Sequence, residues 1–109
     1  MTLPESDWRL FREVHRAALD RYCARVLEEC ATTVRDTDAT AHDRYLRLYR
    51  LLQDRDKSIA VAFNDFRRST AVVQSAAMIA LEVVTDDELA SFSEPTRKSA
   101  VALADLQHP

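Results

Sequence analysis

The chain of 109 residues contains no glycine. Glycine enters positive φ more freely than any other residue, and tight hairpin turns, β-bulges and most left-handed helix C-caps depend on it. Its absence predicts an all-α fold whose helices are joined by loops of ordinary backbone geometry. It also argues against P-loops, dinucleotide-binding fingerprints and nucleophile elbows, because each needs glycine where the backbone turns sharply or approaches a ligand.

Length and composition fit one helical-bundle domain over residues 1–109, since 47% of the residues are hydrophobic. The most apolar stretch, residues 71–84, contains Gln74, Ser75 and Glu82 and falls short of the ~18 apolar residues that span a bilayer. The N-terminus has neither the basic nor the apolar region of a secretory signal. We therefore expect a cytoplasmic protein with no membrane partner.

Two cysteines, Cys23 and Cys30, lie seven residues apart in one predicted helix. That spacing separates their Cα atoms by about 10.5 Å, too far for a disulfide, and favours a reducing compartment. The same cysteines and His15 lack the spacing of a zinc site, so a second helix would have to supply ligands, with His42 and His108 as the only other imidazoles. We expect inert core cysteines, no metal and no cofactor.

The net charge of −3 is unevenly distributed. Residues 1–68 carry 13 basic and 12 acidic side chains, whereas residues 69–109 carry two basic and six acidic ones. Arginine supplies 13 of the 15 positive charges, and its planar guanidinium suits bidentate pairing with carboxylate or phosphate. No segment has the positive excess typical of a nucleic-acid-binding protein.

Apolar spacing predicts a first helix from about Asp7 to Asp36, with Ser6 or Asp7 as its N-cap. Its apolar stripe consists of Trp8, Phe11, Val14, Ala18, Tyr22, Val26, Cys30 and Val34. A helix of about 45 Å is long for a domain of this size. We interpret it as the spine of a bundle or as part of a dimer interface along the Val26, Cys30 and Val34 face.

A second helix is predicted from Thr40, which resembles a capping box with Asp43, to about Arg55. Its expected inner side consists of Tyr45, Leu48, Tyr49 and Leu52. The charged residues 54–58 suggest an interruption, although nothing in them forbids one continuous helix. A core position at Leu48 would make Leu48→Ala cost about 2 to 5 kcal/mol.

A third helix is predicted from about Ser58 to Val84, with Arg67 and Arg68 midway. Its expected inner positions are Ile59, Phe63, Phe66, Thr70, Val73, Ala77, Ala80 and Val84. Small residues in its second half would let neighbouring helices approach closely, so we expect it to be central. Phe63→Ala should carry the same cost as Leu48→Ala if Phe63 lies in the core.

The C-terminal part contains two helix starts. Thr85 and Glu88 form a capping box that opens a short helix ending near Phe92. Ser93 as N-cap, with Pro95 in the first turn, opens a last helix that runs to about Leu106. We expect Val101, with Leu103 or Leu106, to face inward. The predicted architecture is a helical bundle of three main helices plus a short C-terminal helical pair.

Two features suggest a binding surface. Arg9, Arg12 and Arg16 form a stripe that would converge with Arg67 and Arg68 on one basic patch if the first and third helices were antiparallel neighbours. The alternative is intramolecular pairing of these arginines with nearby carboxylates. The single tryptophan, Trp8, either forms part of a partner surface or closes the end of the bundle.

An enzymatic site has little support. Glu82 is the one carboxylate within an apolar stretch, and burial would raise its pKa and make it a candidate general base. The alternative places Glu82 in solvent. An interhelical active site would require Glu82, Arg68 and Ser69 to face one cavity, and neither Ser69 nor Ser75 has a histidine at a catalytic spacing. We expect no catalytic residues.

Several short segments resemble a family of short, mostly uncharacterised bacterial proteins. The shared features are a D-W-x-L-aromatic-R start (residues 7–12), an R-S step (Arg68 and Ser69) and a D-L-x-x-F-S-type helical ending (residues 85–94). Some members carry the label multidrug transporter, which does not suit a chain without a membrane span. The resemblance implies a compact helical domain and no particular chemistry, with Trp8, Arg12, Arg68 and Ser69 as the matching positions. The family tends to place Pro-Gly between the second and third helices, which this chain lacks.

Together these patterns predict a protein-interaction or adaptor domain that binds another protein or associates with itself. The alternative is a nucleic-acid-binding or regulatory protein that uses its arginine-rich helix faces. The candidate binding residues are Trp8, Arg12, Arg16, Arg67, Arg68 and Ser69.

Overall fold

The computed structural model describes residues 3–107. Its elements are α1 (Glu5–Arg35), α2 (Ala41–Phe63), the short 3₁₀ helix η1 (Arg68–Thr70), α3 (Ala71–Ala80), α4 (Asp86–Ser91) and α5 (Glu94–Gln107). No strand occurs within residues 3–107. The all-α prediction is therefore confirmed.

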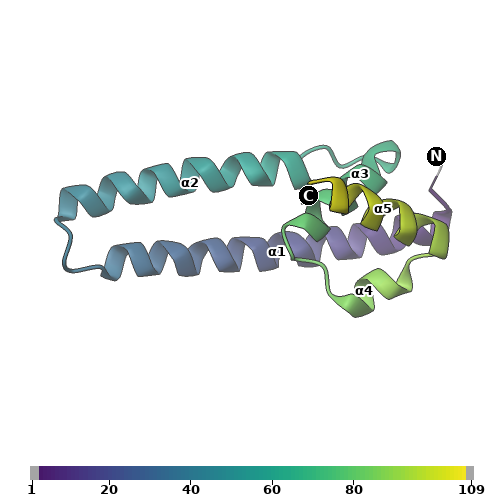
Figure 1. Cartoon of the computed structure of the whole chain (residues 1–109), viewed down its shortest axis with the longest axis horizontal. Coiled ribbons are helices and arrows are strands. Elements are labelled where there is room, and N and C mark those ends of the chain that lie inside the picture. Colours follow the sequence, from purple (N-terminus) through teal and green to yellow (C-terminus); the bar gives the residue numbers. More distant parts are fainter. Residues whose placement is uncertain (1–2, 108–109) are drawn as a thin grey trace.

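α1 and α2 form a long antiparallel hairpin, and α3, α4 and α5 gather at only one end of it (Figure 1). The molecule measures 52 × 23 × 22 Å, and its radius of gyration of 16.3 Å exceeds the ~13 Å of a compact chain of this length. We name two regions. The head comprises residues 3–26 and 59–107, and the arm comprises residues 27–58.

The hydrophobic core lies in the head, with α3 at its centre. Six of the ten residues of α3 are buried, namely Ala71, Gln74, Ser75, Ala76, Ala77 and Met78. The small side chains among them let α3 pack closely on its neighbours, as the sequence predicts. Phe11 and Met78 are completely buried, and Phe63 is 3% exposed. Gln74 is an exception within this core, because neither Oε1 nor Nε2 has a hydrogen-bond partner among the described residues.

The start of α1 differs from the prediction. The N-cap is Pro4, whose carbonyl oxygen accepts a 2.9 Å hydrogen bond from the Trp8 N–H, so neither Ser6 nor Asp7 caps this helix. Proline lacks an N–H donor and has a fixed φ, which makes it suitable for the entry to a helix. Asp7 lies inside the first turn, so its carboxylate can accept hydrogen bonds from another helix.

α2 continues through residues 54–58 to Phe63, so the predicted break near Arg55 and helix start at Ser58 are wrong. Its start is as predicted, because the Thr40 hydroxyl accepts from the Asp43 N–H at 3.1 Å. The chain leaves the helix at Asn64 and Asp65, residue types whose side chains compete for backbone hydrogen bonds. The predicted third helix is therefore divided between α2 and α3.

α3 ends in a Schellman motif. The Glu82 N–H donates to Ile79 O at 2.9 Å and the Val83 N–H donates to Met78 O at 3.2 Å. Glu82 occupies the left-handed position with φ of 61°, where most proteins use glycine. α3 therefore ends at Ala80, four residues before the predicted end at Val84.

The C-terminal helices begin as predicted. Thr85 and Glu88 form a complete capping box at the start of α4. The Ser93 carbonyl accepts from the Arg97 N–H at 2.9 Å, which makes Ser93 the N-cap of α5. The inward face of α5 was predicted wrongly. Its buried residues are Thr96, Ala100 and Ala104, whereas Leu103 and Leu106 are exposed and Val101 is half-buried.

None of the helices described over residues 3–107 has both the length and the apolar character required to cross a membrane.

Candidate functional site

The first set of predicted site residues lies at the end of the head. Trp8 is half-buried and packs on two aromatic rings, with centroid distances of 5.8 Å to Phe11 and 5.4 Å to Phe66. The Arg12 guanidinium lies 5.7 Å from the Trp8 ring centroid in a cation–π contact. Trp8 thus helps to close the end of the core, and Arg12 covers its ring.

The predicted basic patch is divided into separate pairs. Arg67 binds Asp65 with two hydrogen bonds of 2.6 and 2.8 Å, which lower the pKa of the Asp65 carboxyl. Arg68 donates to the Leu3 carbonyl at 2.6 and 3.0 Å and to Glu5 at 2.8 Å. These guanidinium groups hold the N-terminal segment and the loop before η1, so they do not present free charge to an anion.

The remaining predicted site residues do not gather into one site. Arg67 and Arg68 lie in the loop and η1 rather than midway along a helix, because α2 ends at Phe63. Ser69 is exposed in η1, and Arg16 is exposed on α1. Arg9 pairs with Glu5 at 3.4 Å on the surface of α1.

The structure also separates the residues of the enzyme hypothesis. Glu82 is exposed beyond the C-terminal end of α3, whereas Arg68 and Ser69 precede its N-terminal end. The ten-residue helix between them is about 15 Å long, so the three side chains do not face one cavity.

The residues weighed as metal ligands do not form a metal site within the described part of the chain. His15 Nε2 lies 3.0 Å from the Phe63 carbonyl, and Cys23 and Cys30 are free and half-buried. Within residues 3–107, no three His, Cys, Asp or Glu side chains are grouped as metal ligands. His108 lies outside the described residues.

Asp7 joins the two ends of the head. It is 2% exposed and accepts hydrogen bonds from the Ser93 N–H at 2.9 Å, the Ser93 hydroxyl at 2.5 Å and the Thr96 hydroxyl at 2.6 Å. Burial is the largest effect and raises the pKa of Asp7, but the three hydrogen bonds together outweigh it and leave the pKa below its ordinary value. Asp7 therefore acts as a structural carboxylate at the N-terminus of α5.

Two further arginines, which the sequence analysis did not single out, hold the α3–α4 connection against α1. Arg21 binds Glu88 through two hydrogen bonds of 2.6 and 2.9 Å and also donates to Val83 O at 2.9 Å. The hydrogen bonds from Arg21 lower the pKa of Glu88. Arg25 donates to Leu81 O at 2.7 Å. The i, i+4 spacing of Arg21 and Arg25 is a local signal, but their partners lie more than 50 residues away.

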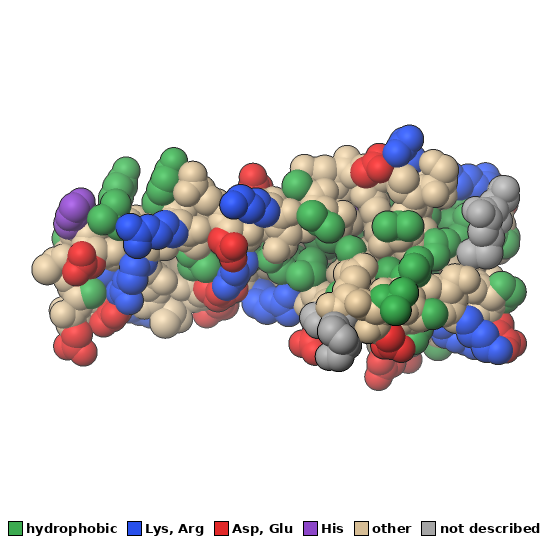
Figure 2. All heavy atoms as spheres, turned by 45° about the horizontal axis from the view of Figure 1, so that its top comes forward, with side chains coloured by type: hydrophobic (Ala, Val, Ile, Leu, Met, Phe, Trp, Pro, Cys, Tyr) green, Lys and Arg blue, Asp and Glu red, His purple; other side chains and the backbone are tan. Residues whose placement is uncertain are grey.

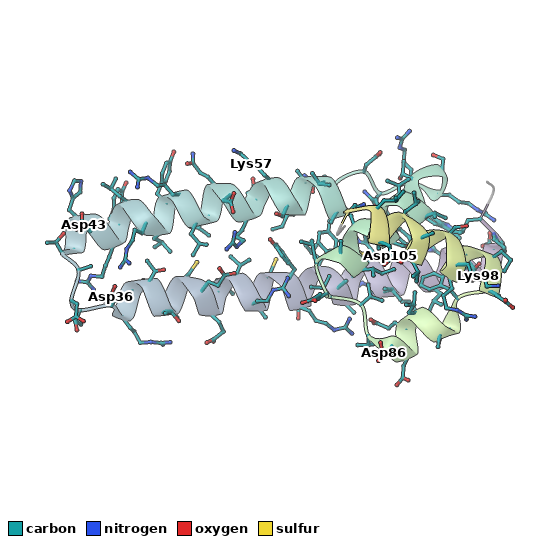
Figure 3. The ribbon with its side chains drawn as sticks, in the orientation of Figure 1. Asp36, Asp43, Lys57, Asp86, Lys98 and Asp105 are labelled. Atoms are coloured by element: carbon teal, nitrogen blue, oxygen red, sulfur yellow. The ribbon has the colours of Figure 1, made fainter. Side chains whose placement is uncertain are left out.

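The arm is held along one edge by polar contacts between its two helices. Arg55 donates two hydrogen bonds to Glu29 at 2.8 and 3.2 Å, which lower the pKa of that carboxyl. Nearer the tip, Arg47 donates to Asp36 at 2.8 Å. Figure 3 shows Asp36 at the end of α1 and Asp43 at the start of α2, at the tip of the arm.

The other edge of the arm carries a set of exposed hydrophobic side chains. No residue from 27 to 61 is buried. The exposed fractions are 65% for Leu27, 51% for Val34, 67% for Tyr45, 56% for Tyr49 and 46% for Leu52. We call these five residues the arm face. The prediction that Tyr45, Tyr49 and Leu52 line the inner side of the second helix is therefore wrong, and Leu48 is half-buried rather than part of the core.

Helix geometry places the arm face on one side. At 100° per residue, Leu27 follows the buried Val26 around α1, and Tyr45 follows the half-buried Arg44, which contacts α1, around α2. Because the two helices are antiparallel (Figure 1), the same step around each helix from its partner-facing line leads to the same lateral side of the arm. Val34 follows Leu27 by two turns, and Tyr49 and Leu52 continue the stripe that begins at Tyr45. Figure 2 shows hydrophobic side chains standing out from the arm. One edge of the arm is thus ion-paired and the other is apolar.

No protein-family model, curated protein or solved structure matches this chain.

Proposed function

We propose that this chain is a protein-interaction domain that binds a protein partner through the arm face. The observation that carries the proposal is the exposure of five large hydrophobic side chains, each between 46% and 67% exposed, along one side of a 27–58 hairpin. Contiguous apolar patches of this kind on a protein surface mark interaction sites.

The composition of the arm face supports a protein partner. Two of its five residues are tyrosines, which combine a large apolar ring with a polar hydroxyl and are enriched at protein interfaces. Between Leu27 and Val34 on α1, the residues on the same side are Cys30 and Ala31, which carry no charge. A partner that covers this surface would therefore bury few charged groups, which favours association.

The difference between the head and the arm also supports binding through the arm face. In the head, Asp7, Arg21 and Arg68 bind groups of the protein itself. The arm carries five of the ten large hydrophobic side chains that are exposed among the described residues, along its two helices. The proposed role needs neither catalytic residues nor a cofactor. We place the protein in the reducing cytoplasm, which suits the free cysteines Cys23 and Cys30.

Nucleic-acid binding through arginine-rich faces is the weaker alternative. Such binding needs guanidinium groups that are free to contact phosphates. Nine arginines instead contact groups of this chain, namely Arg9, Arg12, Arg21, Arg25, Arg44, Arg47, Arg55, Arg67 and Arg68. The net charge of −3 points the same way.

The test is site-specific photo-crosslinking in cells that produce the full chain. A benzophenone amino acid at Tyr49 should give a covalent adduct with a protein, whereas the same group at the control position Ser91, exposed on α4, should give markedly less. Equal yields at both positions, or no protein adduct at Tyr49, would refute binding through the arm face. Adducts with nucleic acid in place of protein would support the alternative.

A further inference from the structure

We infer that a second copy of this chain covers the arm face, in an antiparallel arrangement centred on Tyr49. This inference rests on the proposed function and names its partner. Two hairpins packed face to face would form a four-helix bundle, in which each helix buries a stripe that it exposes in the single copy.

The size of the arm fits such a pairing. The part of α2 within the arm, residues 41–58, is about 27 Å long, and two helices side by side are about 20 Å wide. The footprint is therefore on the order of 500 Å² per copy, or about 1,000 Å² for the pair, which is near the lower limit for a specific interface. A weak to moderate homodimer is the expected result.

The spacing of residues along α2 favours the antiparallel orientation. Tyr49 lies at the middle of residues 41–58, so a twofold axis beside it would place the tip of one arm where the head of the other begins. His42 and Asp56 precede and follow Tyr49 by seven residues, so each lies about two turns from Tyr49 on the same side of the helix. Across this axis, His42 of each copy faces Asp56 of the other.

The charges of the arm agree with this arrangement. An interface around a twofold axis must be complementary to itself, because each residue meets its counterpart from the symmetric position. His42 and Asp56 are both exposed and satisfy that condition as a hydrogen-bond donor and an acceptor. Between them, the stripe formed by Tyr45, Tyr49 and Leu52 carries no charged group.

The first test is the molar mass of the full chain by light scattering or sedimentation, at protein concentrations from about 1 to 100 µM, a range suited to a small interface. The mass should rise toward twice 12.4 kDa. It should change little with salt, because apolar contacts dominate the interface. A monomer over the whole range would overturn the inference.

A matched pair of variants locates the interface. Tyr49→Glu should raise the dissociation constant by about 30-fold, as expected for loss of a central aromatic residue. Val61→Glu is the control, since Val61 is 73% exposed on α2 but lies outside the arm face. Circular dichroism should show that both variants keep their helices. Equal dimerisation of the two variants would overturn the inference.

A charge exchange tests the orientation. His42→Glu alone should weaken the dimer, because each glutamate would face Asp56 of the other copy. Asp56→Lys added to His42→Glu should restore it. Failure of this rescue would rule out the antiparallel register.

The two proposals can fail separately. If the chain stays monomeric by light scattering while Tyr49 crosslinks to a different protein in cells, the second-copy inference is wrong and the proposed function stands. If Tyr49 crosslinks to nothing and the chain stays monomeric, both are wrong.

Discussion

The head and the arm contain the same two helices but differ in what packs against them. Six residues of α1, from Asp7 to Val26, are buried in the head, and none is buried beyond that point. α2 shows the same change, since its only buried residues are Ala62 and Phe63 at the head end. The hydrophobic pattern continues through both regions. Burial here is decided by whether a third helix covers the hairpin.

The two regions also differ in their polar contacts. In the head, buried or partly buried groups such as Asp7 and Glu88 receive several hydrogen bonds from distant elements. In the arm, the pairs of Glu29 with Arg55 and of Asp36 with Arg47 are partly exposed and join neighbouring helices only. These contacts join residues 67 to 89 apart in the sequence in the head and residues 11 to 26 apart in the arm.

The largest expected contrast comes from truncating one side chain in each region. Phe63→Ala should lower the free energy of unfolding by about 3 to 5 kcal/mol, because Phe63 lies in the core of the head. Leu48→Ala in the arm should cost only about 1 kcal/mol, because Leu48 is half-buried. Urea denaturation of both variants measures the difference. Similar losses at the two positions would contradict the division into head and arm.

The next contrast concerns the buried carboxylate of the head. Asp7→Asn should cost about 2 kcal/mol at neutral pH, since charge-assisted hydrogen bonds to Ser93 and Thr96 are lost. The exposed Asp105→Asn in α5 is the matched control and should leave stability nearly unchanged.

The same pair of variants gives a pH dependence of known sign. Because the pKa of Asp7 is lower in the folded state than its ordinary value of 3.8, the stability that it contributes is present above that value. It is lost as the pH falls through the folded-state pKa. The gap between the native chain and Asp7→Asn should therefore narrow from about pH 6 to about pH 2.5 in urea denaturation. A difference in the free energy of unfolding that grew as the pH fell would contradict the stabilising role of the Asp7 carboxylate.

A smaller effect of opposite sign is expected at Gln74. Its amide is 2% exposed and lacks a hydrogen-bond partner among the described residues. Gln74→Met keeps the approximate volume and removes the unpaired polar atoms, so the Tm should rise by an amount equivalent to about 1 to 2 kcal/mol. Gln74→Glu is the opposing control and should destabilise the head strongly, because it buries a charge. A loss of stability in Gln74→Met would show that the amide is satisfied.

The smallest effect is expected at the boundary between α3 and α4. Glu82→Gly should raise the free energy of unfolding by up to about 1 kcal/mol, because glycine adopts φ of 61° without the steric cost of a Cβ. Glu82→Ala keeps the Cβ and should give no gain. Thermal denaturation of the two variants separates the backbone effect from the loss of the carboxylate. Equal changes of Tm in the two variants would contradict a steric cost at Glu82.

Much of the fold could be predicted from local sequence. The absence of glycine indicated helices, and the Thr85 capping box placed the start of α4 correctly. The break after Phe63 was missed because it contains neither glycine nor proline, and the apolar Phe66 continued the helical spacing. Phe66 instead packs on Trp8 from a loop, which only the folded chain reveals.

The candidate site was harder to predict, because amphipathic spacing shows that a stripe exists but not what covers it. Tyr45, Tyr49 and Leu52 have the spacing of core residues, yet α3 and α5 do not reach them (Figure 1). Asp7 was interpreted as a cap for its own helix, whereas its carboxylate serves a helix 86 residues away in sequence. Pairings over such distances leave no local signal.

The contact between Asp7 and Ser93 has a consequence for the order of events during synthesis. A chain emerging from the ribosome presents Asp7 early, but its hydrogen-bond donors are made 86 residues later. The α1–α2 hairpin, whose helices are adjacent in sequence, can form in the meantime. Until Ser93 and Thr96 are released, Asp7 remains hydrated. The arm, whose helices are complete once Phe63 has been made, can therefore form before the head has closed.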